Sequence, residues 1–298
     1  MSNSRSDGSQ ARSDGTGEPG RCEWLTLQQA FEAFVLNASG HQGQGHIRPL
    51  HYYVASRLVI EGGFAPDDIT PRPPFVVKER SGRRILEYDP ASGGSGERTV
   101  LGGLKTKAVD VVVTKPGIGP VLAVSMKGTL GAFRNLTNRM EEAIGDCTNL
   151  HISYPALVYG FFQVLRATRA GPGVAPNDVC ILPDGSAVEA IVRYHDVLTR
   201  LEGRLDLRDE TTKYEAVSLS LIKPDEPNRG TVLPNFPPAE SPLSMSGFFA
   251  KLYRAYDLRF VYAAPKLESV TARLLWDESS PALTDPRKKD YAARVGTP

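Results

Sequence analysis

The chain has 298 residues, of which 41% are hydrophobic and 23% are charged, and its formal net charge is +1. This length is enough for a large buried core, and we expect one domain over residues 22–298. A net charge near zero excludes a protein that is basic over its whole surface, so any contact with nucleic acid has to depend on local groups of Lys and Arg.

The first 21 residues differ in composition from the rest of the chain. They are rich in Ser, Gly and Asp and repeat Arg-Ser-Asp-Gly at positions 5–8 and 12–15. A segment with so few apolar side chains cannot bury enough surface to fold, so we predict a disordered tail over residues 1–21. It lacks the apolar core of a signal peptide, and no other stretch approaches about twenty apolar residues, so we expect a cytoplasmic protein without a membrane span.

Residues 47–61 predict a helix that carries apolar residues at Leu50, Tyr53, Val54, Leu58 and Ile60 and ends at Gly62 and Gly63. Glu61 falls in the last turn, where the helix dipole disfavours negative charge. A bound metal would compensate, which makes Glu61 a candidate metal ligand, and Arg57 four residues earlier is the alternative partner.

Neither the cysteines nor the histidines follow a common metal-binding pattern. Cys22, Cys147 and Cys180 lack Cys-x-x-Cys spacing, so we expect reduced thiols and no zinc site. His41, His46 and His51 are spaced five and five, and we interpret them as residues of a loop and of a helix start, with a metal or phosphate role as the alternative.

Two β-branched segments, Ala108–Thr114 and Val121–Lys127, flank a turn rich in Gly and Pro and predict a β-hairpin. Equal arms place Asp110 opposite Ser125, and Lys127 shares the face of Ser125 because side chains alternate along a strand. One divalent ion or one phosphate could then contact all three side chains. The alternative is structural, with Asp110 paired to a nearby lysine.

A helix is predicted to begin near Asn135 or Thr137. Its apolar residues recur at helical spacing and form a stripe that faces the core: Leu136, Met140, Ala143, Cys147 and Leu150. Arg134, Asn138 and Glu141 follow the same spacing on another face, which can approach the end of the strand that carries Lys127. Glu141 can therefore supply a second carboxylate, and Glu142 is its competitor.

The arrangement Asp110, Ser125-Met126-Lys127 resembles the PD-(D/E)XK nucleases, with serine at the position of the second acid. One branch, the type II restriction endonucleases that cut sites with a CCGG core, has this serine and a displaced glutamate fourteen residues after the lysine, which matches Glu141. Arg134 matches a DNA-reading arginine of that branch, whereas Gly131 and Phe133 replace its other arginine and its aspartate. The resemblance implies an α/β (α+β) fold with a central mixed sheet flanked by helices.

Phosphodiester cleavage requires an activated water and charge neutralisation at phosphorus, which carboxylate-held Mg²⁺ supplies. The residues expected to hold Mg²⁺ are Asp110, Glu141 and Glu61. Lys127 stabilises charge, and Ser125 forms a hydrogen bond in the site. The residues expected to contact DNA are Arg134, Asn138, Arg139, Lys105 and Lys107.

We therefore expect a type II restriction enzyme that cuts double-stranded DNA as a homodimer or tetramer, with a companion DNA methyltransferase. Two alternatives stay open. One is a nuclease of low specificity in phage defence or repair, and the other is a DNA-binding protein on a nuclease core that has lost catalysis, for which Ser125 is the supporting feature.

The remaining segments alternate between strands and helices. We predict a strand or short helix over Pro155–Leu165, helices over Val188–Leu201 and Ser246–Tyr256, and a strand over Lys213–Ile222. This alternation is typical of a mixed α/β sandwich.

Overall fold

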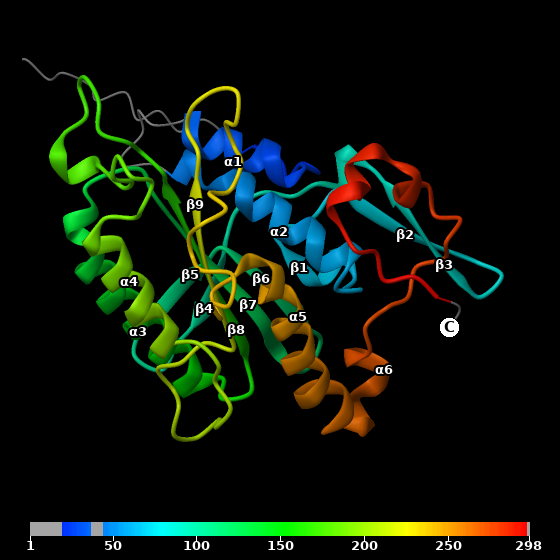
Figure 1. The fold of residues 1–298 in the computed structure, drawn as a ribbon. Helices are drawn as coiled ribbons and strands as arrows, with labels where there is room; N and C mark the ends of the chain where they lie inside the picture. The colour runs from blue at the N-terminus through cyan, green and yellow to red at the C-terminus, as the bar shows by residue number, and fades with distance from the viewer. Residues whose placement is uncertain (1–19, 37–43, 297–298) are drawn as a thin grey trace, which may run out of the picture.

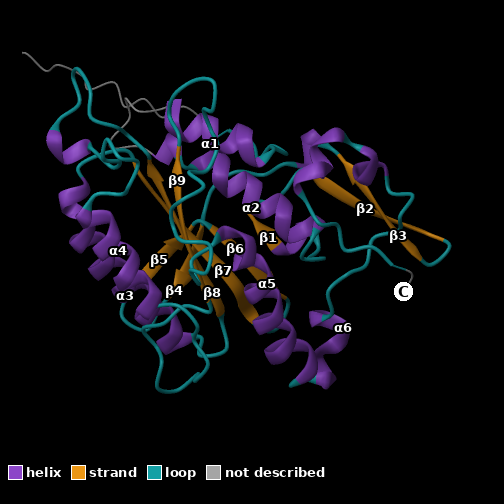
Figure 2. Cartoon of the chain, in the orientation of Figure 1, coloured by secondary structure: helices purple, strands orange, loops and turns teal. Residues whose placement is uncertain are grey.

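The computed structural model describes residues 20–36 and 44–296. Most of the predicted tail and His41 lie outside the described residues. The central element is a five-stranded sheet with the strand order β1-β6-β7-β8-β9 (Figures 1 and 2). Its strands are β1 (Ile69–Thr70), β6 (Val111–Lys115), β7 (Gly119–Thr129), β8 (Val158–Arg166) and β9 (Ala216–Ile222). The strands β1, β6 and β7 are antiparallel neighbours, and β7, β8 and β9 run parallel, so the sheet is mixed.

Helices cover both faces of this sheet, as Figure 1 shows. One core contains residues of α1 (Leu27–Leu36), α2 (Arg48–Ile60) and α5 (Met245–Tyr256), together with alternate residues of the strands such as Val111 and Val124. The other core contains residues of α3 (Leu136–Ser153) and α4 (Glu189–Arg200), with Val112 and Ala123 from the intervening strand positions. The fold is therefore mixed α/β with a central mixed sheet between helices, and this part of the predicted fold class is confirmed.

The predicted hairpin is present, with one correction. Val111 pairs with Val124 and Val112 with Ala123, which is the expected register. However, the prediction of a single strand over Ala108–Thr114 is wrong, because the strand is interrupted at Asp110. The residues before the break form β5 (Thr106–Val109), which pairs with β4 (Arg98–Leu101) in a separate two-stranded sheet. The Asp110 carboxylate accepts a hydrogen bond of 2.6 Å from the backbone N–H of Met126, so this side chain satisfies a backbone donor where the ladder ends.

The other predicted elements agree with the structure to within a few residues. Helix α2 corresponds to the segment before Gly62, and α3 follows a 3₁₀ turn (Phe133–Asn135) and buries Leu136, Ala143, Cys147 and Leu150 as expected. The segment Pro155–Leu165 forms strand β8 rather than a helix, while α4, β9 and α5 match the later predictions.

A further hairpin, β2 (Phe75–Arg80) and β3 (Arg83–Tyr88), lies beside the C-terminal segment (Figure 1). The backbone N–H of Leu86 donates to Ser280 Oγ at 3.0 Å and that of Asp277 to the carbonyl of Arg84 at 2.9 Å. Besides Phe133–Asn135, the short helical turns among the described residues are Gln44–His46, Pro66–Asp68, Pro90–Ser92, Pro176–Asp178, Pro265–Leu267, α6 (Glu268–Thr271), Pro281–Thr284 and Pro286–Asp290, with a π-helical segment at Asp257–Tyr262. Within the described residues, every helix is too short or too polar to cross a membrane.

Candidate metal centre

Two consecutive hairpins bring three polar residues into one row. In the β4–β5 hairpin Arg98 pairs with Val109, so Glu97 and Asp110 are the next positions beyond this pair. In the β6–β7 hairpin Val111 pairs with Val124, so Asp110 and Ser125 are the next positions there. Asp110 thus lies between Glu97 and Ser125, at the point where the chain passes from one sheet to the other.

Helix α2 adds a histidine to this row. His51 is only 3% exposed, and its Nε2 lies 3.6 Å from Oδ1 of Asp110. None of the residues that the structure describes forms a hydrogen bond with this nitrogen. One donor atom from each of His51, Glu97 and Asp110 lies within 4.8 Å of the other two, which is close enough for one cation to contact all three after small side-chain adjustments.

Burial shifts the pKa values of His51 and Asp110. It lowers the pKa of His51 to about 4, so the imidazole is neutral at pH 7 and has a free lone pair for a metal. Burial also raises the pKa of Asp110, and this effect is opposed by the hydrogen bond from the Met126 N–H and by attraction to Lys127. A divalent cation would favour the ionised carboxylate further, because it places positive charge beside a poorly solvated anion.

Lys127 lies near the C-terminal end of β7, and its side chain contacts helix α3. Its Nζ lies 3.1 Å from Oε1 of Glu142, and Nη1 of Arg139 lies 3.0 Å from Oε2 of the same carboxylate. Partial burial disfavours the charged form of Glu142, but attraction and hydrogen bonds from Lys127 and Arg139 outweigh it and lower its pKa. The acid that α3 presents to Lys127 is therefore Glu142.

The two other predicted metal ligands lie apart from this cluster. Glu141 is exposed and, within the described part of the chain, has no hydrogen bond or ion pair. Glu61 forms an ion pair of 2.7 Å with Arg57 and accepts a hydrogen bond from the N–H of Ala292. It follows His51 by ten residues, or about 15 Å along the helix axis at about 1.5 Å per residue. Arg57, the alternative partner, thus compensates the negative charge of Glu61 at the end of α2.

The remaining site candidates have distinct surroundings. Ser125 is buried, and its hydroxyl lies 2.7 Å from that of Tyr159. Lys107 forms an ion pair with Asp146 of α3, so it is held against the protein rather than extended into solvent. Lys105, Asn138 and Arg139 are exposed, and the backbone of Arg134 lies in the 3₁₀ turn before α3.

A cavity of about 440 Å³ begins directly after Lys127. Its wall is made of the segment from Gly128 to Ala132 and of side chains from the start of α3 and two neighbouring turns: His46, Asn135, Leu136, Arg139 and Asp178. Ala132 adopts a left-handed conformation (φ 54°), and its N–H donates a hydrogen bond of 2.6 Å to Oδ1 of Asp178. The hydrogen bond to Asp178 therefore fixes the end of the segment from Gly128 to Ala132, which lines the cavity.

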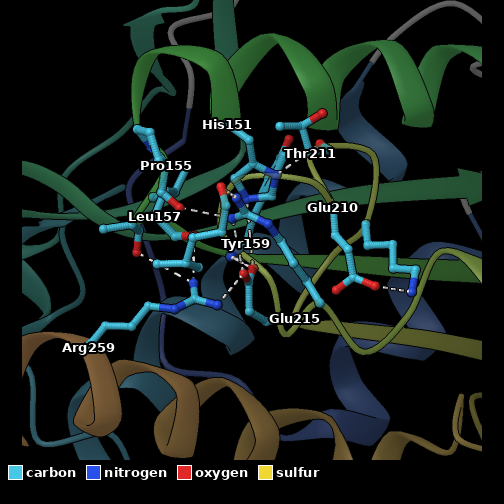
Figure 3. A network of polar contacts seen from close by, with 12 residues as sticks. His151, Pro155, Leu157, Tyr159, Glu210, Thr211, Glu215 and Arg259 are labelled. Carbon is cyan, nitrogen blue, oxygen red and sulfur yellow. Dashed lines mark hydrogen bonds and ion pairs between the residues drawn. The ribbon is translucent and has the colours of Figure 1, made fainter. Parts of the chain in front are cut away.

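A second buried polar network lies at the other end of the parallel strands (Figure 3). Glu215, which directly precedes β9, contacts Nη2 of Arg259 at 2.7 Å and Nη1 of Arg204 at 3.3 Å, and it accepts a hydrogen bond of 2.6 Å from the N–H of Tyr159. His151 Nε2 lies 3.8 Å from the same carboxylate. Both arginines also donate to carbonyls just before β8, so the network joins the sheet to the segment after α5.

A scan against protein-family models found no match, and searches of curated proteins and of solved structures found none either.

Sequence reasoning missed Glu97 and left His51 outside any site. A signal for Glu97 was present, because equal arms about a turn over residues 102–105 place it opposite Asp110, by the same argument that pairs Asp110 with Ser125. His51 gives no comparable signal, since its position depends on how α2 packs across the sheet. In the structure His51 lies in the first turn of α2, as interpreted, and its ring also contacts Asp110.

Proposed function

We propose that the protein is a divalent-metal-dependent endonuclease that cuts double-stranded DNA, of the type II restriction class. The observation that carries this proposal is the convergence of His51, Glu97 and Asp110 beside Lys127 at the end of β7. The central mixed sheet flanked by helices agrees with the fold that the resemblance to PD-(D/E)XK nucleases implies. The proposed metal ligands differ from the earlier prediction, because Glu97 and His51 replace Glu141 and Glu61.

Each group has a chemical task in this proposal. His51, Glu97 and Asp110 would hold the cation, Mg²⁺ in the first instance, which when bound neutralises phosphate charge and acidifies a water. Lys127 would donate hydrogen bonds to a phosphate oxygen and stabilise the charge that develops there. The hydrogen bond from the Met126 N–H fixes one oxygen of Asp110, so this carboxylate is oriented before any substrate arrives. The bond between Ser125 and Tyr159 anchors the strand behind Lys127.

The cavity after Lys127 supports a polyanionic substrate. Its wall includes Arg139 and the loop that begins at Gly128, the residue directly after Lys127. Both cations are held by Glu142, which a phosphate would have to displace. A DNA strand in this position would bring its phosphates beside the centre formed by His51, Glu97 and Asp110.

The restriction role adds two partners. A palindromic duplex has two-fold symmetry, and a homodimer places one active centre at each strand of such a site. Cutting of the cell's own DNA has to be prevented, and a companion methyltransferase would do so by modifying the recognition site.

The experiment is digestion of unmethylated phage DNA with Mg²⁺, using the wild type, Asp110→Asn and Lys127→Ala. The exposed Asp225 supplies the matched control Asp225→Asn. Discrete fragments from the wild type and the control, lost in the two site variants, are the expected result. A smear would instead identify a nuclease of low specificity, and intact DNA that is nevertheless bound would identify a DNA-binding protein without catalysis.

A further inference from the structure

The centre contains a nitrogen donor among oxygen donors. His51 comes from α2, which is almost entirely buried and begins with a proline in its first turn, so the imidazole is presented from a rigid element. Its Nε2 faces Asp110, and none of the described residues hydrogen-bonds to it. Burial of a polar atom without a partner carries a desolvation cost, and a ligand bound at this atom would recover that cost.

The donor set discriminates between cations. Mg²⁺ strongly prefers oxygen ligands and loses its waters reluctantly, so a buried imidazole contributes little to its binding. First-row transition ions accept imidazole, and Mn²⁺ combines this with the preference for carboxylates that it shares with Mg²⁺. Thiolates would favour softer ions, but all three cysteines, Cys22, Cys147 and Cys180, lie outside the cluster.

We propose that His51 is a metal ligand that makes this centre selective for Mn²⁺ over Mg²⁺. The inference rests on the proposed function for the presence of a cation at the site, and it deepens that function by naming the ion. Among the described residues, two carboxylates and one imidazole would supply three protein donors, and the other coordination positions of the ion would be open to water or to phosphate oxygens.

The first test needs no variant and no DNA. Full-length protein is titrated separately with MnCl₂ and MgCl₂ in a calorimeter, and the Mn²⁺ complex is examined by pulsed electron paramagnetic resonance for coupling to ¹⁴N. We expect one Mn²⁺ per chain, bound at least about tenfold more tightly than Mg²⁺, which corresponds to about 1.4 kcal/mol. We also expect a ¹⁴N coupling from a directly bound imidazole.

Two substitutions then assign the nitrogen. His51→Asn is expected to weaken Mn²⁺ binding by at least about tenfold and to abolish the ¹⁴N coupling, since loss of even an outer hydrogen-bond partner of a ligand costs about 10- to 100-fold in affinity. Mg²⁺ binding should change little. The matched control is His195→Asn on α4, whose ring hydrogen-bonds to Ser241 and lies outside the cluster, and it should behave as the wild type.

Equal affinity of the wild type for both ions, or bound Mn²⁺ without ¹⁴N coupling, would overturn the inference. Because these measurements contain no DNA, they are distinguishable from a failure of the proposed function. A protein that cuts DNA but shows no nitrogen ligand refutes only the role of His51, whereas one that binds Mn²⁺ through nitrogen and leaves all DNA intact refutes only the nuclease activity.

Discussion

Lys127 and Glu142 form an ion pair, with 3.1 Å between Nζ and Oε1, across the end of strand β7 and helix α3. The other oxygen of the same carboxylate contacts Arg139 at 3.0 Å. One acid thus partly neutralises two cations, Arg139, which lines the cavity after β7, and Lys127, which directly precedes the wall of that cavity. A phosphate placed there would compete with Glu142 for both partners.

Replacement of Glu142 by Gln is expected to strengthen metal-free binding of DNA. The pair is partly exposed, and such pairs contribute about 0.2–1 kcal/mol, so the affinity should rise by up to about fivefold. Fluorescence anisotropy with a labelled duplex, repeated over a range of salt concentrations, measures the change.

Glu141→Gln is the matched control for that substitution, because Glu141 is the neighbouring residue and is exposed. It should leave DNA binding and cleavage unchanged. Loss of cleavage in Glu141→Gln, with Glu142→Gln active, would instead restore Glu141 as the metal ligand.

Replacement of Glu215 by Gln is expected to destabilise the fold strongly. Glu215 and Arg204 have side chains that are 1% and 0% exposed, and removal of the negative charge leaves both Arg204 and Arg259 without the carboxylate that compensates them. Figure 3 shows Glu215 and Arg259 in this network. Breaking a buried pair in this way costs about 3–5 kcal/mol. Urea unfolding followed by circular dichroism gives the change in free energy. The exposed pair of Glu189 and Arg193 supplies the control Glu189→Gln, which should keep the wild-type midpoint.

His151 is expected to make the folded protein less stable as the pH is lowered below the ordinary pKa of histidine. Burial, followed by repulsion from Arg204, lowers its pKa to about 3, whereas in the unfolded chain it is about 6.5. Between these values the unfolded chain binds a proton that the folded protein does not, so the free energy of unfolding decreases as the pH falls. The contribution approaches about 1.4 kcal/mol per pH unit between pH 6 and pH 4.

The contribution of His151 is isolated by comparing the wild type with His151→Gln over this range. The comparison is needed because the pKa of Glu215 is raised by burial, and a raised pKa favours the folded state as the pH falls. The variant should show a shallower acid dependence. Parallel curves for the two proteins would show that His151 is protonated in the folded state as readily as in the unfolded chain.

Addition of Mn²⁺ is expected to raise the melting temperature of the wild type. A ligand that binds only the folded state stabilises it by about 2.7 kcal/mol at a hundred times its dissociation constant. Asp110→Asn removes one ligand charge and should abolish most of the shift, and excess EDTA should reverse it. Asp225→Asn is the control, and an equal shift in both variants would place the cation elsewhere.

The sequence predicted the parts of this site that depend on local patterns. The β-branched runs and the turn between them predicted the register of β6 and β7, and helical spacing predicted α2 and α3. Asp110, Ser125 and Lys127 were found because their relation follows from the pairing of one hairpin. The pairing of β4 with β5 would have added Glu97 by the same geometry.

The parts that depend on packing between distant elements could not be predicted. Successive residues of a helix point about 100° apart. An error of one residue in the expected spacing therefore turns a carboxylate away from Lys127. This is why Glu142, and not Glu141, contacts Lys127. The approach of His51 to Asp110 depends on the packing of α2 against β6, which no local pattern encodes. The pairing of Glu215 with Arg259 joins residues 44 positions apart in the sequence and has the same origin.

The most direct measurement is a time course of cleavage of supercoiled plasmid DNA by the wild type and by Asp110→Asn, with Mg²⁺, with Mn²⁺ and with EDTA. We predict that the wild type converts the plasmid to linear DNA with either ion, faster with Mn²⁺, and that both EDTA and Asp110→Asn abolish the reaction. Plasmid that stays supercoiled with every ion, or an Asp110→Asn variant that cuts as fast as the wild type, would contradict the assignment of this centre as a nuclease site.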